Sequence, residues 1–295
     1  MDAIILSAGE GTRLRPLTLH KAKPLVPILC KPLIEHIISN LESSGIFRAV
    51  VNLWYRSEEM QGYIENRQST GMKLFPVVEE RLLGTGGGIS NAAMALDGSE
   101  PVLVHNGDIF ANIDFTPAII RHRESGSAIT LFVRDGAPEV TVIGGDAIDI
   151  VGKIGIEDGN KYKFTGISIW DRRALSYLTP PRQPGCAVEA IAEIIRREKG
   201  AVRIEHIGSA LWSDVGTVSS YLELHRRLLS INRIYPDNFE LPLGVRTDGF
   251  LCCCDGAKIC AGATLKDVVL WKGSVVQPGK SIEKAVVGPF GVVRA

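Results

Sequence analysis

The sequence predicts an α/β protein whose core is a doubly wound, mostly parallel sheet, followed by a smaller β-rich appendage. Short apolar runs alternate with helix-periodic segments as far as about residue 125, which is typical of βαβ units. Over roughly the last forty residues, aliphatic side chains and glycines instead recur every six positions. The chain has 295 residues, which is enough for one large domain and an appendage.

Five apolar runs are expected to form buried strands of the sheet. They are Ala3 to Leu6, Ala49 to Leu53, Leu74 to Val78, Val102 to Val104 and Ile129 to Val133. Between the first two, the aliphatic residues from Leu33 to Leu41 share one helical face, and Gly45 is expected to end that helix. Thr116 and Pro117 predict the start of a second helix, and Thr217 predicts the cap of a third.

The remaining segments are expected to be β-rich or irregular. Residues 140–169 combine short strand-like runs with glycine turns, which predicts a β-rich insertion that could roof a site. After residue 230, a linker is indicated by Pro236, Asp237, Asn238, Pro242 and Gly244. The six-residue spacing that follows predicts about two coils of a parallel β-helix, fewer than the three repeats expected to stand alone. The coils must therefore lean on the first domain or on another subunit.

Composition excludes several classes of partner. Lys plus Arg and Asp plus Glu both number 33, so no broad positive field exists for nucleic acid or an anionic membrane. The N-terminal segment fits neither a signal peptide nor a membrane span, so a cytoplasmic protein is expected. The six cysteines contain no C-x-x-C pair, and reduced thiols are expected. Because Cys252, Cys253 and Cys254 would point to alternating faces of a strand, no metal site is expected there.

The segment after the first expected strand carries the strongest chemical signal. Gly9-Glu10-Gly11-Thr12-Arg13 allows close backbone approach, and its successive N–H groups can line a phosphate nest. The third glycine of the dinucleotide fingerprint is missing, and no G-K-[ST] motif of a P-loop is present. The alternative reading is a tight turn beside solvated basic residues.

The whole segment from Leu6 to Leu33 resembles the signature L-x-[AG]-G-x-G-T-R-L-x-P-L-T, P-K-P-L-x-P, K-P-[LM]-[IL] of the sugar-1-phosphate nucleotidyltransferases. Three further motifs follow in that family's order: Leu83 to Gly88, Asn106-Gly107-Asp108 and Trp212 to Thr217. The resemblance implies a Rossmann-like catalytic domain over residues 1–228. It also implies that residues 229–295 form a linker and a short left-handed parallel β-helix.

The resemblance also implies which residues bind the nucleotide. Its phosphates would be held by Ala8, Gly9, Gly11, Thr12 and Arg13, with Arg13 also stabilising the pyrophosphate leaving group. Gly86 and Gly87 would bring main chain against the nucleobase; the alternative there is a flexible loop that leads into a helix at Ile89.

The sugar phosphate would contact Lys23, which aligns with the family's P-K-P lysine although Ala22 replaces the preceding proline. Lys21 is the competing choice, and in the alternative reading both lysines are solvated. Gly166 would give backbone access to the sugar ring. The family's Glu-Lys-Pro segment is absent, so no glutamate contact to the sugar transfers, and Glu157 is a weak candidate.

A divalent metal completes the implied site. Asp108 and Asp214 match the family's two carboxylate ligands, and Mg²⁺ typically combines such carboxylates with phosphate oxygens and water. Taken alone, a Gly-Asp pair is most often a turn. Arg13, Lys23, Asp108 and Asp214 are thus the catalytic set that the resemblance implies.

The implied reaction joins a nucleoside triphosphate and a sugar 1-phosphate to give a nucleoside-diphosphate sugar and pyrophosphate. The motifs look most like mannose-1-phosphate guanylyltransferases and N-acetylmuramate-1-phosphate uridylyltransferases, and the β-helical tail favours the former. Glucose 1-phosphate with dTTP or UTP, a non-catalytic nucleotide-binding relative and acyltransfer by the tail are the alternatives. The tail is expected to pack on the catalytic domain or to build a homodimer.

Overall fold

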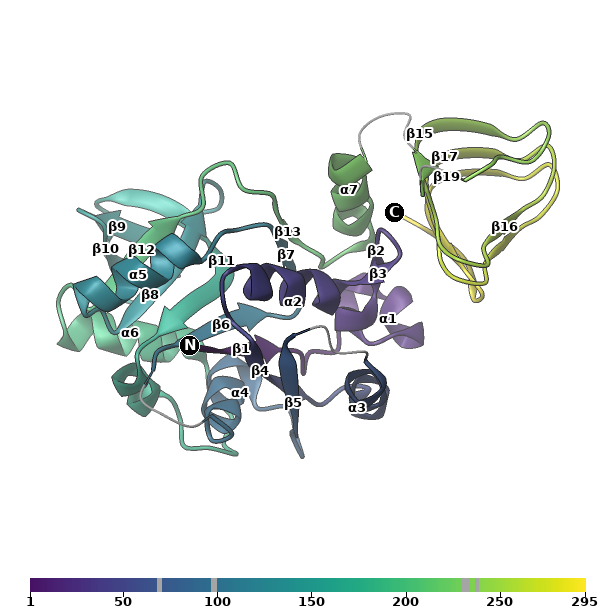
Figure 1. Cartoon of the computed structure of the whole chain (residues 1–295). Helices are drawn as coiled ribbons and strands as arrows, with labels where there is room; N and C mark the ends of the chain where they lie inside the picture. Colours follow the sequence, from purple (N-terminus) through teal and green to yellow (C-terminus); the bar gives the residue numbers. More distant parts are fainter. Residues whose placement is uncertain (68–70, 97–99, 230–233, 237–238) are drawn as a thin grey trace. The chain divides into compact units, whose positions relative to one another are not determined.

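The computed structural model describes residues 1–67, 71–96, 100–229, 234–236 and 239–295, drawn in colour in Figure 1. The chain forms two compact units. Unit 1 comprises Met1–Gly9 and Ile37–Trp212, and unit 2 comprises Glu10–His36 and Ser213–Ala295. The domain boundary predicted between residues 228 and 229 lies inside unit 2, and Asp237 and Asn238 of the predicted linker lie outside the described residues.

Unit 1 is built around a nine-stranded sheet. In spatial order, its strands are β5 (Lys73–Val78), β4 (Arg48–Leu53), β1 (Asp2–Leu6), β6 (Val102–Asn106), β11 (Asn160–Trp170), β8 (Ile129–Arg134), β12 (Val202–His206), β10 (Asp146–Ile150) and β9 (Val140–Ile143). Each of the five predicted buried runs falls within one of these strands. The prediction fails in detail for β5, whose side chains are mostly exposed or half-buried because it is the edge strand.

The first half of the sheet is parallel. Its strands are added first on one side of β1 and then on the other side, so the strand order reverses at β1. The chain moves from β1 to β4 and β5 on one side and then returns to β6 on the other side of β1. Open α/β sheets bind ligands at the carboxyl ends of the strands that flank such a reversal. In unit 1, those ends are Leu6 and Asn106, which are register partners in the parallel β1 and β6 pair.

The second half of the sheet is mixed, so the expectation of a mostly parallel sheet is wrong there. β11 runs antiparallel to both β6 and β8, and β10 runs antiparallel to β12 and β9. β11 is the long return strand of the β-rich segment predicted for residues 140–169. Because it leaves an insertion rather than a crossover helix, nothing constrains it to run parallel to its neighbours.

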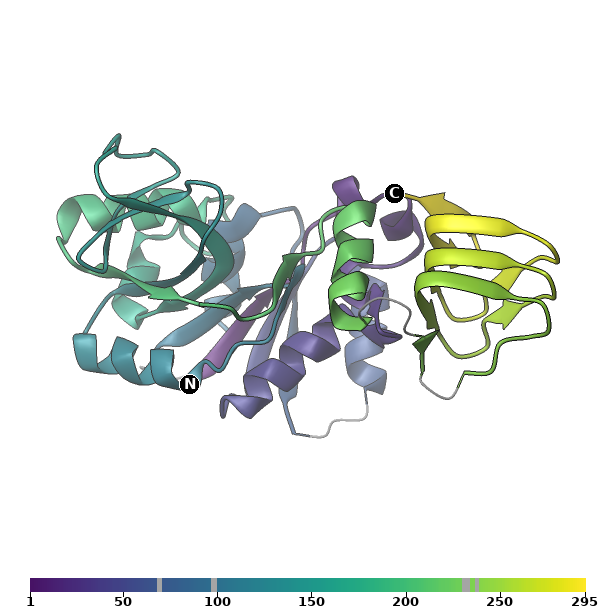
Figure 2. The same cartoon turned by 90° about the horizontal axis from the view of Figure 1, so that it is seen from above.

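Helices cover both faces of this sheet. They are α3 (Ser57–Asn66), α4 (Gly84–Ala93), α5 (Thr116–Ser125) and α6 (Ala187–Arg197), with the short η3 (Arg172–Tyr177); α2 (Leu33–Ser43) begins in unit 2 and continues into unit 1. Figure 2 shows α5 and α6 on opposite sides of the sheet. Buried residues of α4 and α6, including Ile89 and Ile191, share a core with strand residues such as Ile4. None of the described helices is both long and apolar enough to cross a membrane.

Unit 2 combines an N-terminal segment with the C-terminal part of the chain. The N-terminal segment contains η1 (Thr12–Leu14), α1 (Leu17–His20), η2 (Lys23–Leu25) and the hairpin strands β2 (Pro27–Ile28) and β3 (Lys31–Pro32). The C-terminal part begins with Ser213 and Asp214 of β13 (Trp212–Asp214) and continues into α7 (Val218–Leu229). The predicted cap of α7 is confirmed, since the Ser220 amide donates to Thr217 Oγ1 at 3.1 Å.

The chain then winds into parallel coils, as the six-residue spacing predicts (Figure 1). The coil strands are β14 (Ile234–Tyr235), β15 (Arg246–Cys253), β16 (Lys258–Ile259), β17 (Thr264–Leu270), β18 (Val275–Val276), β19 (Ser281–Gly288) and the antiparallel β20 (Gly291–Arg294). β15, β17 and β19 pair in parallel, as do β16 and β18. The aliphatic hexad positions are buried, and the four predicted corner glycines have φ values from 63° to 75°.

The expectation of six reduced thiols is wrong for two of them. Cys30 and Cys254 form a disulfide within unit 2, and Cys186, Cys252, Cys253 and Cys260 are free. The two joined residues are 224 positions apart in the sequence. Their pairing depends on how the hairpin packs on the first coil, which spacing motifs do not reveal.

Candidate functional site

The carboxyl ends of β1 and β6 carry two of the predicted motifs in unit 1. The Gly107 amide donates to Leu6 O at 2.8 Å, and a Cβ atom at Gly107 would lie 2.6 Å from Ser7 Oγ. Only glycine therefore allows these strand ends to come so close. Ala8 is buried, Gly9 is exposed with open space beside its α-carbon, and Asp108 is half-buried.

Two polar residues outside the predicted motifs, Asn52 and Glu79, hold this strand end in place. The Ser7 amide donates to Asn52 Oδ1 at 2.8 Å, and Asn52 Nδ2 donates to Glu79 Oε1 at 2.7 Å. Glu79 Oε2 in turn accepts the Leu83 amide at 3.0 Å. Both side chains are almost fully buried, so this chain of hydrogen bonds fixes Ser7 relative to the start of α4. The available signal was a polar residue one position before the end of one apolar run, Asn52, and another directly after the end of the next run, Glu79.

The glycine run predicted as a nucleobase-contacting loop is the first turn of α4, which begins at Gly84 rather than at Ile89. The Gly86 and Gly87 amides donate to Gly185 O at 2.9 and 3.3 Å. A Cβ at Gly86 would lie 2.7 Å from the Cys186 carbonyl carbon, and one at Gly87 would collide with Gln183 O. Packing of backbone against backbone thus explains both glycines, and their contact with a nucleobase stays a prediction.

The sugar-side glycine lies next to the Asn106-Gly107-Asp108 segment. Gly166 is in the irregular part of β11, between Phe164 and Ser168, and has a φ of 78°. A Cβ there would lie 2.7 Å from Asn106 Nδ2. The structure therefore brings Gly166 to the carboxyl end of β6, where the predicted metal ligand Asp108 also lies.

His105 lies on β6, directly before the Asn106-Gly107-Asp108 segment. Its Nδ1 is 2.8 Å from Asn106 O, and the ring packs edge-on against Phe115. Burial lowers the pKa of His105 from 6.5 to about 4, although its hydrogen bond to Asn106 and the charge of Asp108 act in the opposite direction. The imidazole is thus neutral at ordinary pH.

In unit 2, Gly11 packs closely against Thr18 and against the predicted site residue Lys23. It has a φ of 64°, and Thr18 Oγ1 donates to its carbonyl at 2.9 Å. A Cβ at Gly11 would lie 2.8 Å from Thr18 Cγ2 and 3.2 Å from Lys23 Cδ. Lys23 is consequently buried along its stem, whereas Lys21 is only half-buried. The reading in which both lysines are simply solvated is therefore wrong for Lys23.

Arg13 and Asp214 meet in unit 2, although 201 positions separate them in the sequence. Arg13 Nη2 lies 3.4 Å from Asp214 Oδ2, and a Cβ on Gly216 would lie 3.0 Å from both terminal nitrogens of Arg13. The Arg13 side chain is 65% exposed, and such exposed pairs contribute at most about 1 kcal/mol. The guanidinium can therefore exchange this partner for a phosphate at little cost.

Asp214 offers a second oxygen suited to a cation. Its Oδ1 atom is buried and has no hydrogen-bond partner among the described residues. A buried carboxylate oxygen without a donor is costly, and a bound cation would satisfy it. Asp108 belongs to unit 1, and Asp214 belongs to unit 2.

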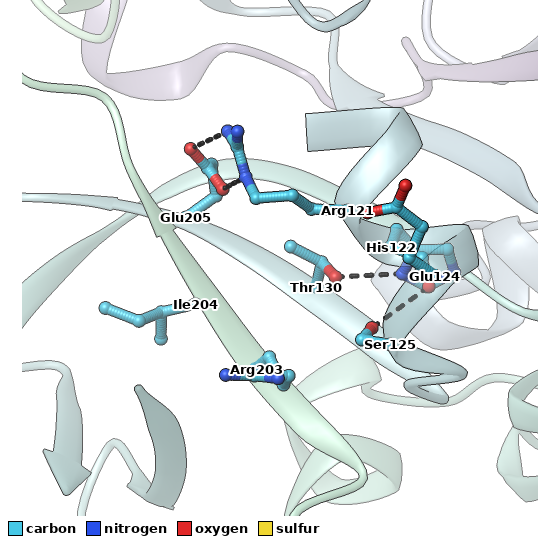
Figure 3. A pocket seen from close by; sticks show the side chains of 8 residues that line it. All are labelled: Arg121, His122, Glu124, Ser125, Thr130, Arg203, Ile204 and Glu205. Carbon is cyan, nitrogen blue, oxygen red and sulfur yellow. Dashed lines mark hydrogen bonds and ion pairs between the residues drawn. The ribbon is translucent and has the colours of Figure 1, made fainter. Parts of the chain in front are cut away.

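A cavity of about 330 Å³ elsewhere in unit 1 contains none of these residues. Figure 3 shows that Arg121 forms a bidentate ion pair with Glu205 there and that His122 is hydrogen-bonded to Thr130. The short Nη2 contact is 2.6 Å, and His122 Nδ1 lies 2.8 Å from Thr130 Oγ1. Because Arg121 pairs with Glu205 and Arg203 pairs with Asp146, which leaves no cluster of free cations among the described lining residues, we assign no function to this cavity.

Comparison with known proteins identifies the family. Residues 2–231 match the nucleotidyl transferase family model. The chain is 28% identical to the mannose-1-phosphate guanylyltransferase of Mycobacterium tuberculosis over 294 residues, which cover 97% of this chain and 79% of that protein. It is also 28% identical to the N-acetylmuramate alpha-1-phosphate uridylyltransferase of Neisseria meningitidis serogroup B over 230 residues, covering 74% and 94% respectively.

A solved structure shares the fold. The crystal structure of HddC from Yersinia pseudotuberculosis, complexed with GMP-PN, superposes with a TM-score of 0.61 at 21% sequence identity. The likeness covers 77% of this chain and 99% of that one. The family match spans the β1 turn, the Asn106-Gly107-Asp108 segment and the Arg13 and Asp214 pair described above. The chain therefore belongs to the nucleotidyl transferase family.

Proposed function

We propose that the protein transfers a nucleotidyl group from a nucleoside triphosphate to a sugar 1-phosphate, giving a nucleoside-diphosphate sugar and pyrophosphate. The observation that carries this proposal is the contact in unit 2 between Arg13 and Asp214, which are 201 positions apart, with Lys23 packed next to Gly11 on the same N-terminal segment as Arg13. A reaction between two polyanions needs charge neutralisation and alignment more than a covalent nucleophile.

The sugar-phosphate oxygen would attack the α-phosphorus and displace pyrophosphate. Arg13 would bind the departing phosphates through its forked donors, and Lys23 would bind phosphate between the two substrates. Ala8, Gly9, Gly11 and Thr12 are the proposed backbone and hydroxyl contacts to the triphosphate. Gly86 and Gly87 are proposed to lie near the base, and Gly166 near the sugar.

Mg²⁺ is the proposed cofactor, with Asp108 and Asp214 as its protein ligands. The pairing of the two rests on their sequence motifs, and the unpartnered Asp214 Oδ1 supports the assignment of that residue. When bound, the ion would supply positive charge to the phosphate oxygens. The protein's own groups would orient the substrates and hold the remaining charge.

Mannose 1-phosphate with GTP is the first choice of substrates. Support comes from the similarity to a mannose-1-phosphate guanylyltransferase along 97% of this chain, including the C-terminal coils, which we propose to be left-handed. The relative named for N-acetylmuramate and UTP matches 74% of the chain, whereas the UTP–glucose-1-phosphate uridylyltransferase of Synechocystis matches 99% of it at the lower identity of 25%. N-acetylmuramate or glucose 1-phosphate with UTP or dTTP is the second choice.

Pyrophosphate release from a matrix of nucleoside triphosphates and sugar 1-phosphates, with Mg²⁺ present, tests the proposal. We expect GTP with mannose 1-phosphate to give the highest kcat/KM. Asp108→Ala and Asp214→Ala should each lower turnover by about 10²-fold or more, because a charge that stabilises the transition state is lost. Asp255→Ala, at an exposed carboxylate of the coil, is the matched control. Nucleotide binding without turnover across the whole matrix would instead indicate a non-catalytic relative.

A further inference from the structure

Three cysteine sulfurs converge in unit 2. The Sγ atoms of Cys30, Cys252 and Cys254 all lie within 4.8 Å of one another. Cys30 and Cys254 form the disulfide, and Cys252 Sγ lies 3.6 Å from Cys30 Sγ. The nucleotidyl transfer proposed above uses none of the three.

The first coil supplies two of the sulfurs from one face. Cys252 is on β15 and Cys254 directly follows this strand, so the two side chains point the same way, with Cys253 pointing to the other side. Cys253 belongs to the aliphatic core of the coils, together with Leu251 and Leu265. The alternation expected from sequence is therefore correct for the three consecutive cysteines. The third sulfur comes from a distant part of the chain.

The β2 and β3 hairpin supplies Cys30 from a strained turn. Leu29 and Cys30 are its two central residues and have φ values of 46° and 65°. Turns of this kind usually contain glycine or asparagine, and a left-handed conformation costs other residues about 1–2 kcal/mol. Such strain persists only where the surroundings impose it. Here the Leu29 amide donates to His225 Nε2 at 3.2 Å, which holds the turn against helix α7.

The surroundings of the three sulfurs favour a cation that is bound by thiolates and keeps one coordination position open. In tetrahedral zinc sites, Zn–S bonds of about 2.3 Å place the sulfurs roughly 3.8 Å apart, close to the observed spacing of Cys30 and Cys252. Cys30 and Cys254 also line a cavity of about 630 Å³. Lys21 and Lys272 line it too, and none of its lining residues in the described part of the chain is acidic. This positive lining favours a site that carries net negative charge.

We propose that Cys30, Cys252 and Cys254, when reduced, bind one Zn²⁺ as three thiolates, with the fourth coordination position open to this cavity. Binding forms three Zn–S bonds and releases three thiol protons to solvent. The disulfide excludes the ion, because it occupies two of the three sulfurs. To form it from the reduced state, Cys30 and Cys254 pass two electrons and two protons to a small disulfide, which becomes two thiols.

Cobalt binding to the intact, reduced chain tests this site, because thiolate ligation of Co²⁺ gives an intense charge-transfer absorption that oxygen ligands do not give. We expect one Co²⁺ per chain with this absorption and its loss when Zn²⁺ is added. Oxidation of the same protein with oxidised glutathione should also remove it. This comparison needs no variant, so it remains valid if a substitution impairs folding.

Variants then assign the ligands. Cys252→Ser and Cys254→Ser should abolish the charge-transfer absorption, and circular dichroism checks that each variant is folded. Cys260→Ser, at a half-buried free cysteine of the coils, is the matched control and should keep it. The site is refuted if the fully reduced protein shows no thiolate absorption, if Cys252→Ser binds like the unmodified chain, or if excess Mg²⁺ removes the signal. Because no readout is catalytic, these outcomes are independent of the proposed nucleotidyl transfer.

Discussion

Arg13 illustrates how a single side chain differs from its neighbours on the same turn. It lies beside Asp214 in unit 2, whereas Arg15, two positions later, pairs with the half-buried Glu10 at 2.9 Å. Both side chains are exposed at the surface of their unit, but only Arg13 is next to a carboxylate with an unpartnered oxygen. The proposed role in phosphate binding therefore applies to Arg13 and not to Arg15.

Arg13→Ala should lower kcat by about 10²-fold or more, because a fixed positive charge on the departing pyrophosphate is lost. Arg13→Lys should recover only part of the activity, since an ammonium cannot bind two phosphate oxygens through a planar fork. Steady-state kinetics of pyrophosphate release measure both effects. Arg15→Ala is the control, and equal losses in the Arg13 and Arg15 variants would contradict the assignment.

His122 should make the protein less stable in acid. Burial lowers its pKa from 6.5 to about 4, aided by the charges of Arg123 and Arg173 and opposed by that of Asp171. Between these two values the unfolded chain binds a proton that the folded chain does not. Protonation of His122 in the unfolded chain should therefore lower the free energy of unfolding by about 2 kcal/mol between pH 7 and pH 5.

Urea denaturation of His122→Asn at the two pH values checks this expectation. The variant should lose about 2 kcal/mol less than the unmodified protein between pH 7 and pH 5. Ser125→Ala changes the same cavity without removing a titratable group and should leave the pH dependence as it is. Parallel pH profiles for the His122 variant and the unmodified protein would show that this imidazole is not the cause.

Sequence motifs predicted the charged residues of the site better than the residues that brace them. Arg13 and Asp214 belong to recognisable motifs, and in the structure they lie 3.4 Å apart. Asn52 and Glu79 belong to no motif, and their link to Ser7 forms only when β1, β4 and β5 lie side by side. Hydrogen bonds between distant strands depend on which strands become neighbours in the sheet, and a short local motif does not specify this.

At the scale of elements, α4 shows why a glycine run can be helical. Glycine is a poor helix former, so the sequence favoured a loop before Ile89. In the structure, the first turn of α4 instead packs its backbone directly on residues 183–186. The tertiary contact requires the absence of side chains, and it outweighs the weak helix propensity.

Gly87→Ala should destabilise the protein by about 1–3 kcal/mol, the usual cost of overpacking, because the new methyl group would collide with the Gln183 carbonyl. Gly62→Ala is the matched control, since Gly62 lies within helix α3 with open space beside its α-carbon. That change should stabilise the protein by about 0.5–1 kcal/mol. Chemical denaturation of both variants measures the difference, and the same sign of effect at both positions would disprove the packing explanation.

At the scale of the whole molecule, the disulfide ties the N-terminal hairpin to the C-terminal coils. Composition and spacing predicted free thiols because the six cysteines contain no C-x-x-C pair and a large core does not require disulfides in a reducing compartment. The parallel coils were predictable because the six-residue repeat is local, whereas the contact between Cys30 and Cys254 is not. The same limit applies to the antiparallel β11, whose place between β6 and β8 is determined only when the sheet assembles.

The disulfide leads to a prediction about thiol number and stability. Alkylation of the unreduced, denatured chain should label four cysteines, and mass spectrometry counts them. In the absence of zinc, reduction should lower the free energy of unfolding by about 2–4 kcal/mol, as for other disulfides. Cys186→Ser should leave the disulfide in place and reduce the count by one. Six labelled cysteines without reductant would show that the bond does not form.

The antiparallel β20 has a consequence for assembly. A stack of parallel coils has no intrinsic stop, since each new coil presents the same edge to which a further chain could add, as in fibre growth. β20 pairs with β19 in the opposite direction and covers that edge with only four residues, which include Arg294. It therefore ends the stack of parallel coils. Removing residues 291–295 should expose the β19 edge and cause end-to-end association, which light scattering would detect as a particle size that rises with protein concentration.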